Sequence, residues 1–261
     1  NIFGINSGSG ELNIADNSSL NFEAASSHTV TVKVQDAGGL NNTADATITV
    51  TNIAEVQTPT IDTAFGVSGT ASSNAFATEQ FDRPRASVID GNGKLVIVGK
   101  NSFSGSSADI FIARFNTDGT LDRSFGKSGV TNQDLGAEEE AVAVAIDSAN
   151  RIVITGNRTS GSTTLVFTAR FSSQGVLDTT FNSGLGFHTY GEIAVNATAT
   201  DAVLDASDNI IIAAGNVNGE FNIIKFSADG TTHVDTTVNF FSGSDFATTV
   251  VLQSDGKALL I

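Results

Sequence analysis

The chain has 261 residues, of which 40% are hydrophobic and only 16% are charged, and 26 are glycines. Its 28 Asp and Glu residues against 13 Lys and Arg residues give a net charge of −15, which repels phosphate backbones and argues against nucleic acid as a partner. Cysteine is absent, which excludes a disulfide framework, a thiol nucleophile and a thiolate metal site. This composition predicts many short strands joined by tight turns, in an all-β protein.

Residues 1–55 contain two segments in which apolar and polar residues alternate. These are Val30–Val34 and Ala46–Val50, and period-two alternation is typical of half-buried strands. The turn-forming cluster Asp36–Asn42 separates them. The pattern predicts a hairpin at the edge of a β-sandwich. Residues 56–61, which include Pro59, are predicted to form a short linker.

Residues 62–261 are built from a repeated unit, and this is the strongest signal in the sequence. Equivalent units begin, at intervals of about 56–60 residues, at Asp62, Asp122, Asp178 and Asp235. Each opens with an Asp-x-x-Phe-like motif whose fifth position is Gly66, Gly126, Asn182 or Asn239. Gly and Asn tolerate positive φ best, so a left-handed backbone is predicted at this position in every unit.

The middle of each unit is a predicted hairpin with a four-residue turn. The fourth turn position is Gly93, Asn150, Asp208 or Gly256, which again indicates positive φ. A third strand and a glycine-containing turn follow, and the fourth strand is expected to lead through the Asp-x-x-Phe motif into the next unit. Four strands per unit indicate β-propeller blades. Three complete units and one partial unit are too few to close a ring, so further blades are expected beyond Ile261.

The repeated unit resembles the delta-60 repeat family. The matching residues are Leu121–Gly129, followed by an Asp-x-x-(Gly/Asn)-(Lys/Arg) hairpin and an Ala-Arg-Phe strand end. The resemblance covers residues 62–261. It implies the fold of a bacterial β-propeller, and it implies no activity. The expected fold is therefore a partial cadherin-like β-sandwich, followed by an incomplete propeller of four-stranded blades of about 56–60 residues.

The first 55 residues resemble the C-terminal part of a bacterial cadherin-like repeat, through Leu20–Glu23, Val30–Asp36 and Ile48–Glu55. The resemblance implies calcium binding by a set of oxygen donors, which comprises Asn21, Glu23, Asp36, Asn52 and Glu55. Calcium takes six to eight oxygen ligands from carboxylates and amides, and these side chains could supply half of them. In the alternative interpretation Asp36 starts a turn and Glu23 is a solvated strand residue.

Residues that recur in every unit are expected to serve the fold. Phe65, Phe125 and Phe181 are predicted to form core between blades. The basic residue of the third strand is predicted to pair with the repeat Asp, as Arg114 with Asp122, Arg170 with Asp178 and Lys225 with Asp235.

Residues that differ between units are the candidates for a ligand face. They are Arg83, Arg85, Glu138, Glu139, Glu140, His188 and Tyr190. All precede the first hairpin strand of their units, in segments that look equivalent and that would line one face of a propeller. Ordinary loop variation is the alternative explanation.

Catalysis has no clear signature. The three histidines, His28, His188 and His233, are widely separated in sequence, and no phosphate loop or nucleophile elbow is present. We therefore expect a non-enzymatic fragment of a large, secreted or membrane-associated bacterial surface protein of adhesin type, cut at both ends. Its expected cofactor is calcium and its expected partner is a protein or glycan on another cell or in the matrix. The alternatives are a carbohydrate-binding module and a secreted propeller enzyme acting on polysaccharide.

Overall fold

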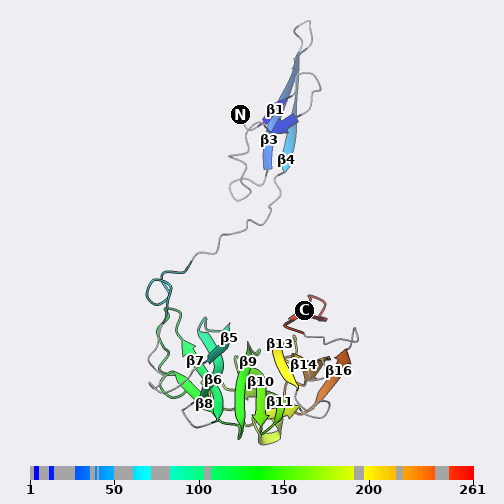
Figure 1. Cartoon of the computed structure of the whole chain (residues 1–261). Helices are drawn as coiled ribbons and strands as arrows, with labels where there is room; N and C mark the ends of the chain where they lie inside the picture. Colours follow the sequence, from blue (N-terminus) through cyan, green and yellow to red (C-terminus); the bar gives the residue numbers. More distant parts are fainter. Residues whose placement is uncertain are drawn as a thin grey trace. The chain divides into compact units, whose positions relative to one another are not determined.

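The computed structural model describes residues 3–5, 12–14, 27–35, 39, 41–49, 61–71, 83–102, 107–190, 197–215, 220–238 and 247–261. It divides into two compact units, Asn1–Thr60 and Ile61–Ile261 (Figure 1). The described residues form β-strands and turns, with one short 3-10 turn at Phe181–Gly184. Within those residues, no helix has both the length and the hydrophobicity that a membrane span requires.

The first unit contains two antiparallel strand pairs. They are β1 (Phe3–Ile5) with β2 (Leu12–Ile14), and β3 (Ser27–Gln35) with β4 (Asn41–Thr49). The second pair confirms the two strands that period-two alternation predicted. The predicted calcium ligands all lie outside the described residues: Asn21, Glu23, Asp36, Asn52 and Glu55. The cadherin-like interpretation of this unit therefore stays a prediction.

The second unit contains three four-stranded antiparallel sheets and a two-stranded sheet. The first sheet is β5 (Arg83–Ile89), β6 (Leu95–Ser102), β7 (Ala108–Phe115) and β8 (Val130–Gln133). The second is β9 (Glu138–Ile146), β10 (Ile152–Ser160), β11 (Thr163–Phe171) and β12 (Phe187–Tyr190). The third is β13 (Thr198–Leu204), β14 (Ile210–Gly215), β15 (Phe221–Phe226) and β16 (His233–Val238), and β17 (Val250–Leu252) pairs with β18 (Ala258–Leu260).

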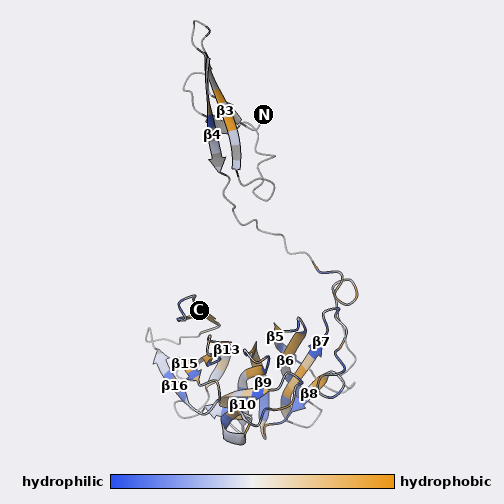
Figure 2. Cartoon of the chain, turned by 180° about the vertical axis from the view of Figure 1, so that it is seen from behind, coloured by the Kyte–Doolittle hydropathy of each residue, from blue (hydrophilic) through white to orange (hydrophobic). Residues whose placement is uncertain are grey.

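The first strands of successive sheets lie next to one another, β5 beside β9 and β9 beside β13 (Figure 1). Between the sheets lie clusters of buried apolar side chains, and hydrophobic residues run along the strands in Figure 2. Four-stranded antiparallel sheets packed in this order are consistent with propeller blades. The described strands do not form a closed ring.

The Asp-x-x-Phe motif precedes the fourth strand, whereas the sequence led us to expect the reverse order. Asp122–Phe125 forms a turn closed by a 3.0 Å hydrogen bond from the Phe125 N–H to the Asp122 carbonyl, and β8 follows it. In the third sheet, Asp235 lies within β16 and forms no such turn. Strands as short as β8 carry too few residues for a period of two to mark them.

The predicted left-handed residues are confirmed wherever the structure describes them. At the motif position φ is 61° for Gly66, 51° for Gly126 and 49° for Asn182, while Asn239 lies outside the described residues. At the fourth hairpin position φ is 77° for Gly93, 60° for Asn150, 62° for Asp208 and 82° for Gly256. These turns form locally, so the residue type at one position was enough to predict them.

The motif phenylalanines Phe125 and Phe181 each pack their own sheet against the next one. Phe125 and Phe181 are fully buried, as predicted, whereas Phe65 is only partly buried. A methyl group on Gly175 would come within 2.5 Å of the Phe125 ring, and one on Gly230 would overlap the Phe181 ring. The motif backbone adds a second connection, because the Gly126 N–H donates to the Gln174 carbonyl at 3.0 Å and the Asn182 N–H to the Asp229 carbonyl at 2.8 Å.

The recurring arginines pair with the repeat Asp residues as predicted. Arg114 Nε donates to Asp122 at 2.8 Å, and Arg170 Nε donates to Asp178 at 2.7 Å. Each guanidinium also donates to a carbonyl of the following sheet, Arg114 to Ser173 and Arg170 to Ala228. The Arg114 guanidinium lies 4.6 Å from the centre of the Phe125 ring, and that of Arg170 lies 4.9 Å from the centre of the Phe181 ring.

The third predicted pair is wrong. Lys225 Nζ donates to Asp205 at 2.8 Å and does not reach Asp235. The register explains this, because Lys225 lies opposite Val234 while Asp235 lies opposite Ile224. Successive strand residues point to opposite faces, so Asp235 projects from the other side of the sheet.

Candidate functional site

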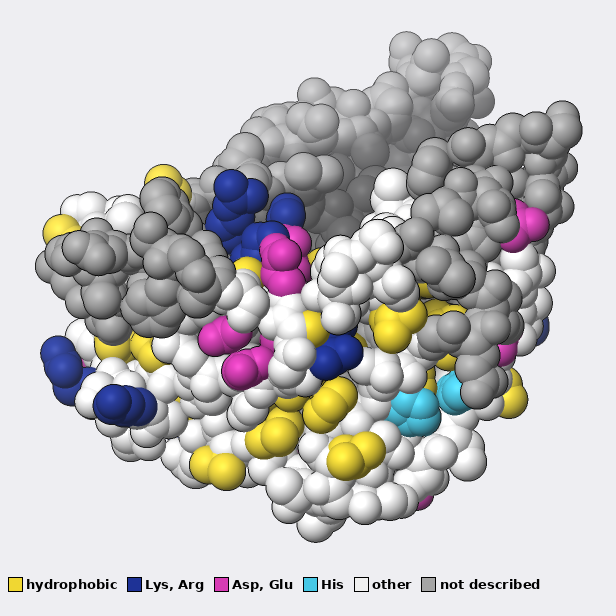
Figure 3. Space-filling view, turned by 60° about the horizontal axis from the view of Figure 1, so that its bottom comes forward, with side chains coloured by type: hydrophobic (Ala, Val, Ile, Leu, Met, Phe, Trp, Pro, Cys, Tyr) yellow, Lys and Arg dark blue, Asp and Glu magenta, His cyan; other side chains and the backbone are white. Residues whose placement is uncertain are grey.

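Charged side chains that do not recur between units gather at one end of the first and second sheets. The register places Arg83 opposite Lys100 and Arg158 opposite Glu139, so the starts of β5 and β9 and the end of β6 share this end. We call this set the charged end, and it comprises Arg83, Arg85, Lys100, Asp109, Asp134, Glu138, Glu139, Glu140 and Arg158. Figure 3 shows basic and acidic side chains lying against one another on the face in view.

A β-bulge directs Arg85 toward the second sheet. Pro84 pairs with Gly99 and Ala86 with Val98, which leaves Arg85 as the extra residue of β5. Gly99 permits the bulge, because a Cβ there would collide with the Arg83 carbonyl oxygen. Bulges re-aim a side chain in this way.

Ion pairs join the two sheets at the charged end. Arg85 Nε lies 2.5 Å from Glu140 Oε1, and Lys100 Nζ lies 3.1 Å from Glu140 Oε2 and 3.7 Å from Glu138 Oε1. Burial would raise the pKa of Glu140, but the hydrogen bonds from Arg85 and Lys100 outweigh it and hold that pKa below its usual value. Arg83 is exposed and Arg85 is half exposed, so both remain accessible to a partner.

Glu139 is the most buried member of the charged end, with no exposed surface. Its carboxylate accepts hydrogen bonds from the Leu135 N–H at 3.2 Å and the Ala137 N–H at 2.9 Å. Arg158 Nε lies 3.3 Å from Glu139 Oε1, and Arg158 Nη2 donates to the Leu135 carbonyl at 3.1 Å. Burial nevertheless raises the pKa of Glu139.

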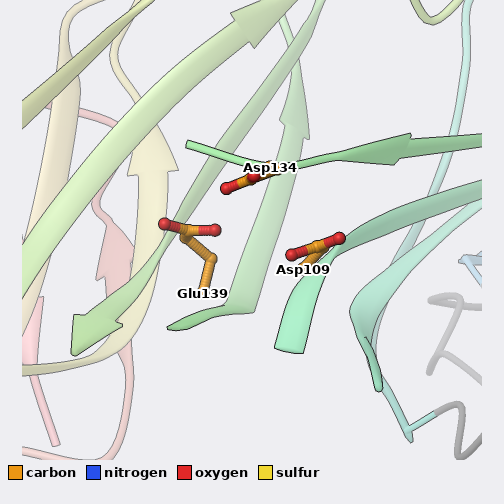
Figure 4. Close-up of side chains that lie close together, drawn as sticks. All are labelled: Asp109, Asp134 and Glu139. Atoms are coloured by element: carbon orange, nitrogen blue, oxygen red, sulfur yellow. The ribbon is translucent and has the colours of Figure 1, made fainter. Parts of the chain in front are cut away.

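Three carboxylates of the charged end converge on one point. Asp109 at the start of β7, Asp134 after β8 and Glu139 on β9 each offer an oxygen, and these oxygens lie within 4.8 Å of one another (Figure 4). Burial raises the pKa of Asp109, and the negative charge of Asp134 raises it further. A group of oxygen donors with this charge suits a hard cation such as Ca²⁺.

The histidine and tyrosine candidates lie elsewhere. His188 and Tyr190 are on β12, the last strand of the second sheet, so they are not equivalent to the candidates at the starts of β5 and β9. Tyr190 is buried in the core between sheets, 1% exposed, where it cannot face a ligand. The alternation of apolar residues did not reveal this strand because it has only four residues.

Two histidines that are far apart in the sequence lie together in the structure. The rings of His188 and His233 are 5.4 Å apart between centroids and nearly perpendicular. His188 Nδ1 lies 2.7 Å from the Gly230 carbonyl oxygen, which can only accept, so Nδ1 carries the proton. His188 therefore helps to connect the second and third sheets.

Sequence reasoning missed four members of the charged end. They are Lys100, Asp109, Asp134 and Arg158. A signal existed for three of them, because Lys100 and Asp109 stand where the next unit has Asn157 and Leu165, and Arg158 stands where the preceding unit has Asn101. Counting from the aligned hairpins would have shown these differences, but would not have placed them beside Glu139.

Comparison with known proteins agrees with the sheet architecture. The family model described as "domain of unknown function (DUF5122) beta-propeller" matches residues 91–125 and 150–181. Each match runs from the hairpin turn through the second and third strands to the motif phenylalanine, Phe125 or Phe181. The second unit thus contains DUF5122 β-propeller segments, while Arg85, Asp134 and Glu138–Glu140 lie outside the matched residues. A search of curated proteins finds no match.

Proposed function

We propose that the second unit is a non-catalytic binding module that presents its charged end to a partner protein, within a large bacterial surface protein of adhesin type. The observation that carries this proposal is the separation of roles among the side chains. The recurring Arg, Asp and Phe residues are occupied by contacts with one another, and the arginines also bond to the next sheet. The charges that do not recur lie together on adjacent strand ends, which form a rigid platform.

The chemistry of this platform favours a protein over a glycan. Sites for sugars usually stack the ring on an exposed aromatic side chain, and the only Tyr of the chain is buried while Trp is absent. Alternating positive and negative groups instead complement a surface that carries charges of both signs. Electrostatic complementarity of this kind acts mainly on specificity and on the association rate.

The binding proposal predicts that charge reversal at this end abolishes capture of the partner. The full chain would be immobilised and tested against extracellular matrix proteins and a glycan array. Arg85→Glu together with Glu138→Lys should reduce binding to a protein partner at least about tenfold, and high salt should slow association. The matched control is Lys257→Glu, an exposed lysine next to a hairpin turn. Equal binding by both variants, or binding to glycans alone, would contradict the proposal.

For the first unit we retain the proposal of calcium binding by Asn21, Glu23, Asp36, Asn52 and Glu55, based on the cadherin-like resemblance. Because calcium would bind only the folded state, it should raise the melting temperature of this unit. The increase should disappear in Glu23→Ala and in Asp36→Ala. Thermal unfolding with calcium and with a chelator tests this, and an unchanged melting temperature in the unsubstituted chain would refute it.

A further inference from the structure

We infer that Asp109, Asp134 and Glu139, together with Asn101, form a binding site for a divalent cation of the calcium class. This site belongs to the second unit and is independent of the calcium site proposed for the first. It would link three segments, since Asp109 is on β7, Asp134 follows β8 and Glu139 is on β9. Cation binding at this site does not depend on whether the charged end also binds a protein.

The spacing of the carboxylates matches the size of the ion. Calcium–oxygen distances are about 2.3–2.6 Å, so two oxygens on opposite sides of one ion lie roughly 4.6–5.2 Å apart. The oxygens of the three carboxylates lie within 4.8 Å of one another (Figure 4). One ion could therefore contact all three without a movement of the strands.

Asn101 is the second, independent observation. Its side chain is 1% exposed, and neither the amide nitrogen nor the amide oxygen has a hydrogen-bond partner. Buried amides are rarely left unpaired, because the loss of hydration is then uncompensated. Asn101 on β6 lies directly opposite Asp109 on β7, and such pairs project from the same face with Cβ atoms about 4.5–5.5 Å apart. The Asn101 side chain therefore lies beside Asp109 on the same face of the sheet, and we infer that its amide oxygen is the fourth ligand.

The charges around the cluster leave room for a cation. Arg158 is the basic group next to Glu139, and it approaches Oε1. Lys100 instead pairs with Glu138 and Glu140. Glu139 Oε2 accepts one hydrogen bond, from the Leu135 N–H, and a carboxylate oxygen has a second lone pair. We expect Oε2 to face the ion. Among the described residues, the guanidinium of Arg158 is the basic group that offsets the three carboxylates.

The test is whether calcium reverses the sign of the change in melting temperature that Asp109→Asn causes. Without divalent cations, Asp109→Asn removes a like charge from the cluster and should raise the melting temperature of the second unit. With calcium, the same substitution removes a ligand and should lower it relative to the unsubstituted chain. Asp118→Asn is the control, because Asp118 is an exposed turn residue outside the cluster. Both variants would be made in the full chain carrying Glu23→Ala and Asp36→Ala, so that only the second unit is probed.

Calcium titration by calorimetry gives the direct reading. In that background we expect about one equivalent of calcium to bind, with affinity on the order of tenfold weaker in Asp109→Asn and unchanged in Asp118→Asn. Asp134→Asn is a second variant that preserves the fold, because its amide oxygen can still accept the hydrogen bond from the Gly136 N–H. If calcium does not bind, or if Asp109→Asn, Asp134→Asn and Asp118→Asn bind it equally, the inference is wrong. Failure of the protein-binding test would not affect this result.

Discussion

Arg114→Met should lower the free energy of unfolding of the second unit by about 3 kcal/mol, as expected when one partner of a buried ion pair is removed. The Arg114 side chain is 3% exposed and donates to Asp122 at 2.8 Å. It also donates to the Ser173 carbonyl in the next sheet and lies over the Phe125 ring. Methionine fills much of the volume but satisfies none of these groups. Lys94, 2.7 Å from Asp122, remains to neutralise the carboxylate and limits the loss.

The matched control for this prediction is Lys257→Met. Lys257 and Asp255 form an ion pair of 2.6 Å, shorter than the buried pair, but their side chains are 76% and 49% exposed. Water screens the charges of an exposed pair, so a change much smaller than that of Arg114→Met is expected. Chemical denaturation of both variants measures the difference. An Arg114→Met variant as stable as the Lys257→Met variant would show that the recurring arginine does not hold the sheets together.

Phe181→Ala should cost about 3–5 kcal/mol, because it empties a fully buried aromatic site between the second and third sheets. Gly230→Ala should also be strongly destabilising, for two reasons that can be separated. Gly230 has φ +72°, which an alanine adopts only with strain, and the new methyl group would overlap the Phe181 ring. The double variant should therefore cost less than the sum of the two single variants, because removing the ring relieves the overlap.

Gly161→Ala measures the backbone strain alone. Gly161 has a similar φ of +61°, but a methyl group there would meet no atom within 4 Å. We expect it to cost roughly 1–2 kcal/mol, the penalty for a left-handed alanine. Additive costs for Phe181→Ala and Gly230→Ala would mean that the ring and the glycine do not restrain one another, and the proposed contact between sheets would have to be abandoned.

The features that the sequence alone determined are local ones. Positive φ at Gly126, Asn182, Asn150 and Asp208 follows from the residue type and its place in a turn. The pairing of Arg114 with Asp122 is also local, because the two residues are eight positions apart and the intervening turn brings them together. Repetition strengthened these predictions, since each recurred in several units.

Other features were decided by the tertiary structure. Whether a strand residue meets a partner depends on which face it projects from, and a shift of one position reverses that face. For this reason Lys225 pairs with Asp205 and Asp235 is left on the other side of the sheet. The short strands β8 and β12 carried no periodic signal, so the order of motif and strand, and the burial of Tyr190, were not predictable.

For the charged end, the sequence indicated some of the residues but not their contacts. Glu138–Glu140 and Arg85 could be singled out because they differ between units. The ion pairs that Arg85 and Lys100 form with Glu140 depend on a bulge in β5 and on the packing of β5 and β6 against β9. The convergence of Asp109, Asp134 and Glu139 needs three strands from two sheets to meet. Residue types and their spacing therefore determined the repeated architecture. Which of the non-recurring residues share a site was decided by the packing of the sheets, because contacts between sheets depend on register and twist rather than on neighbours in the chain.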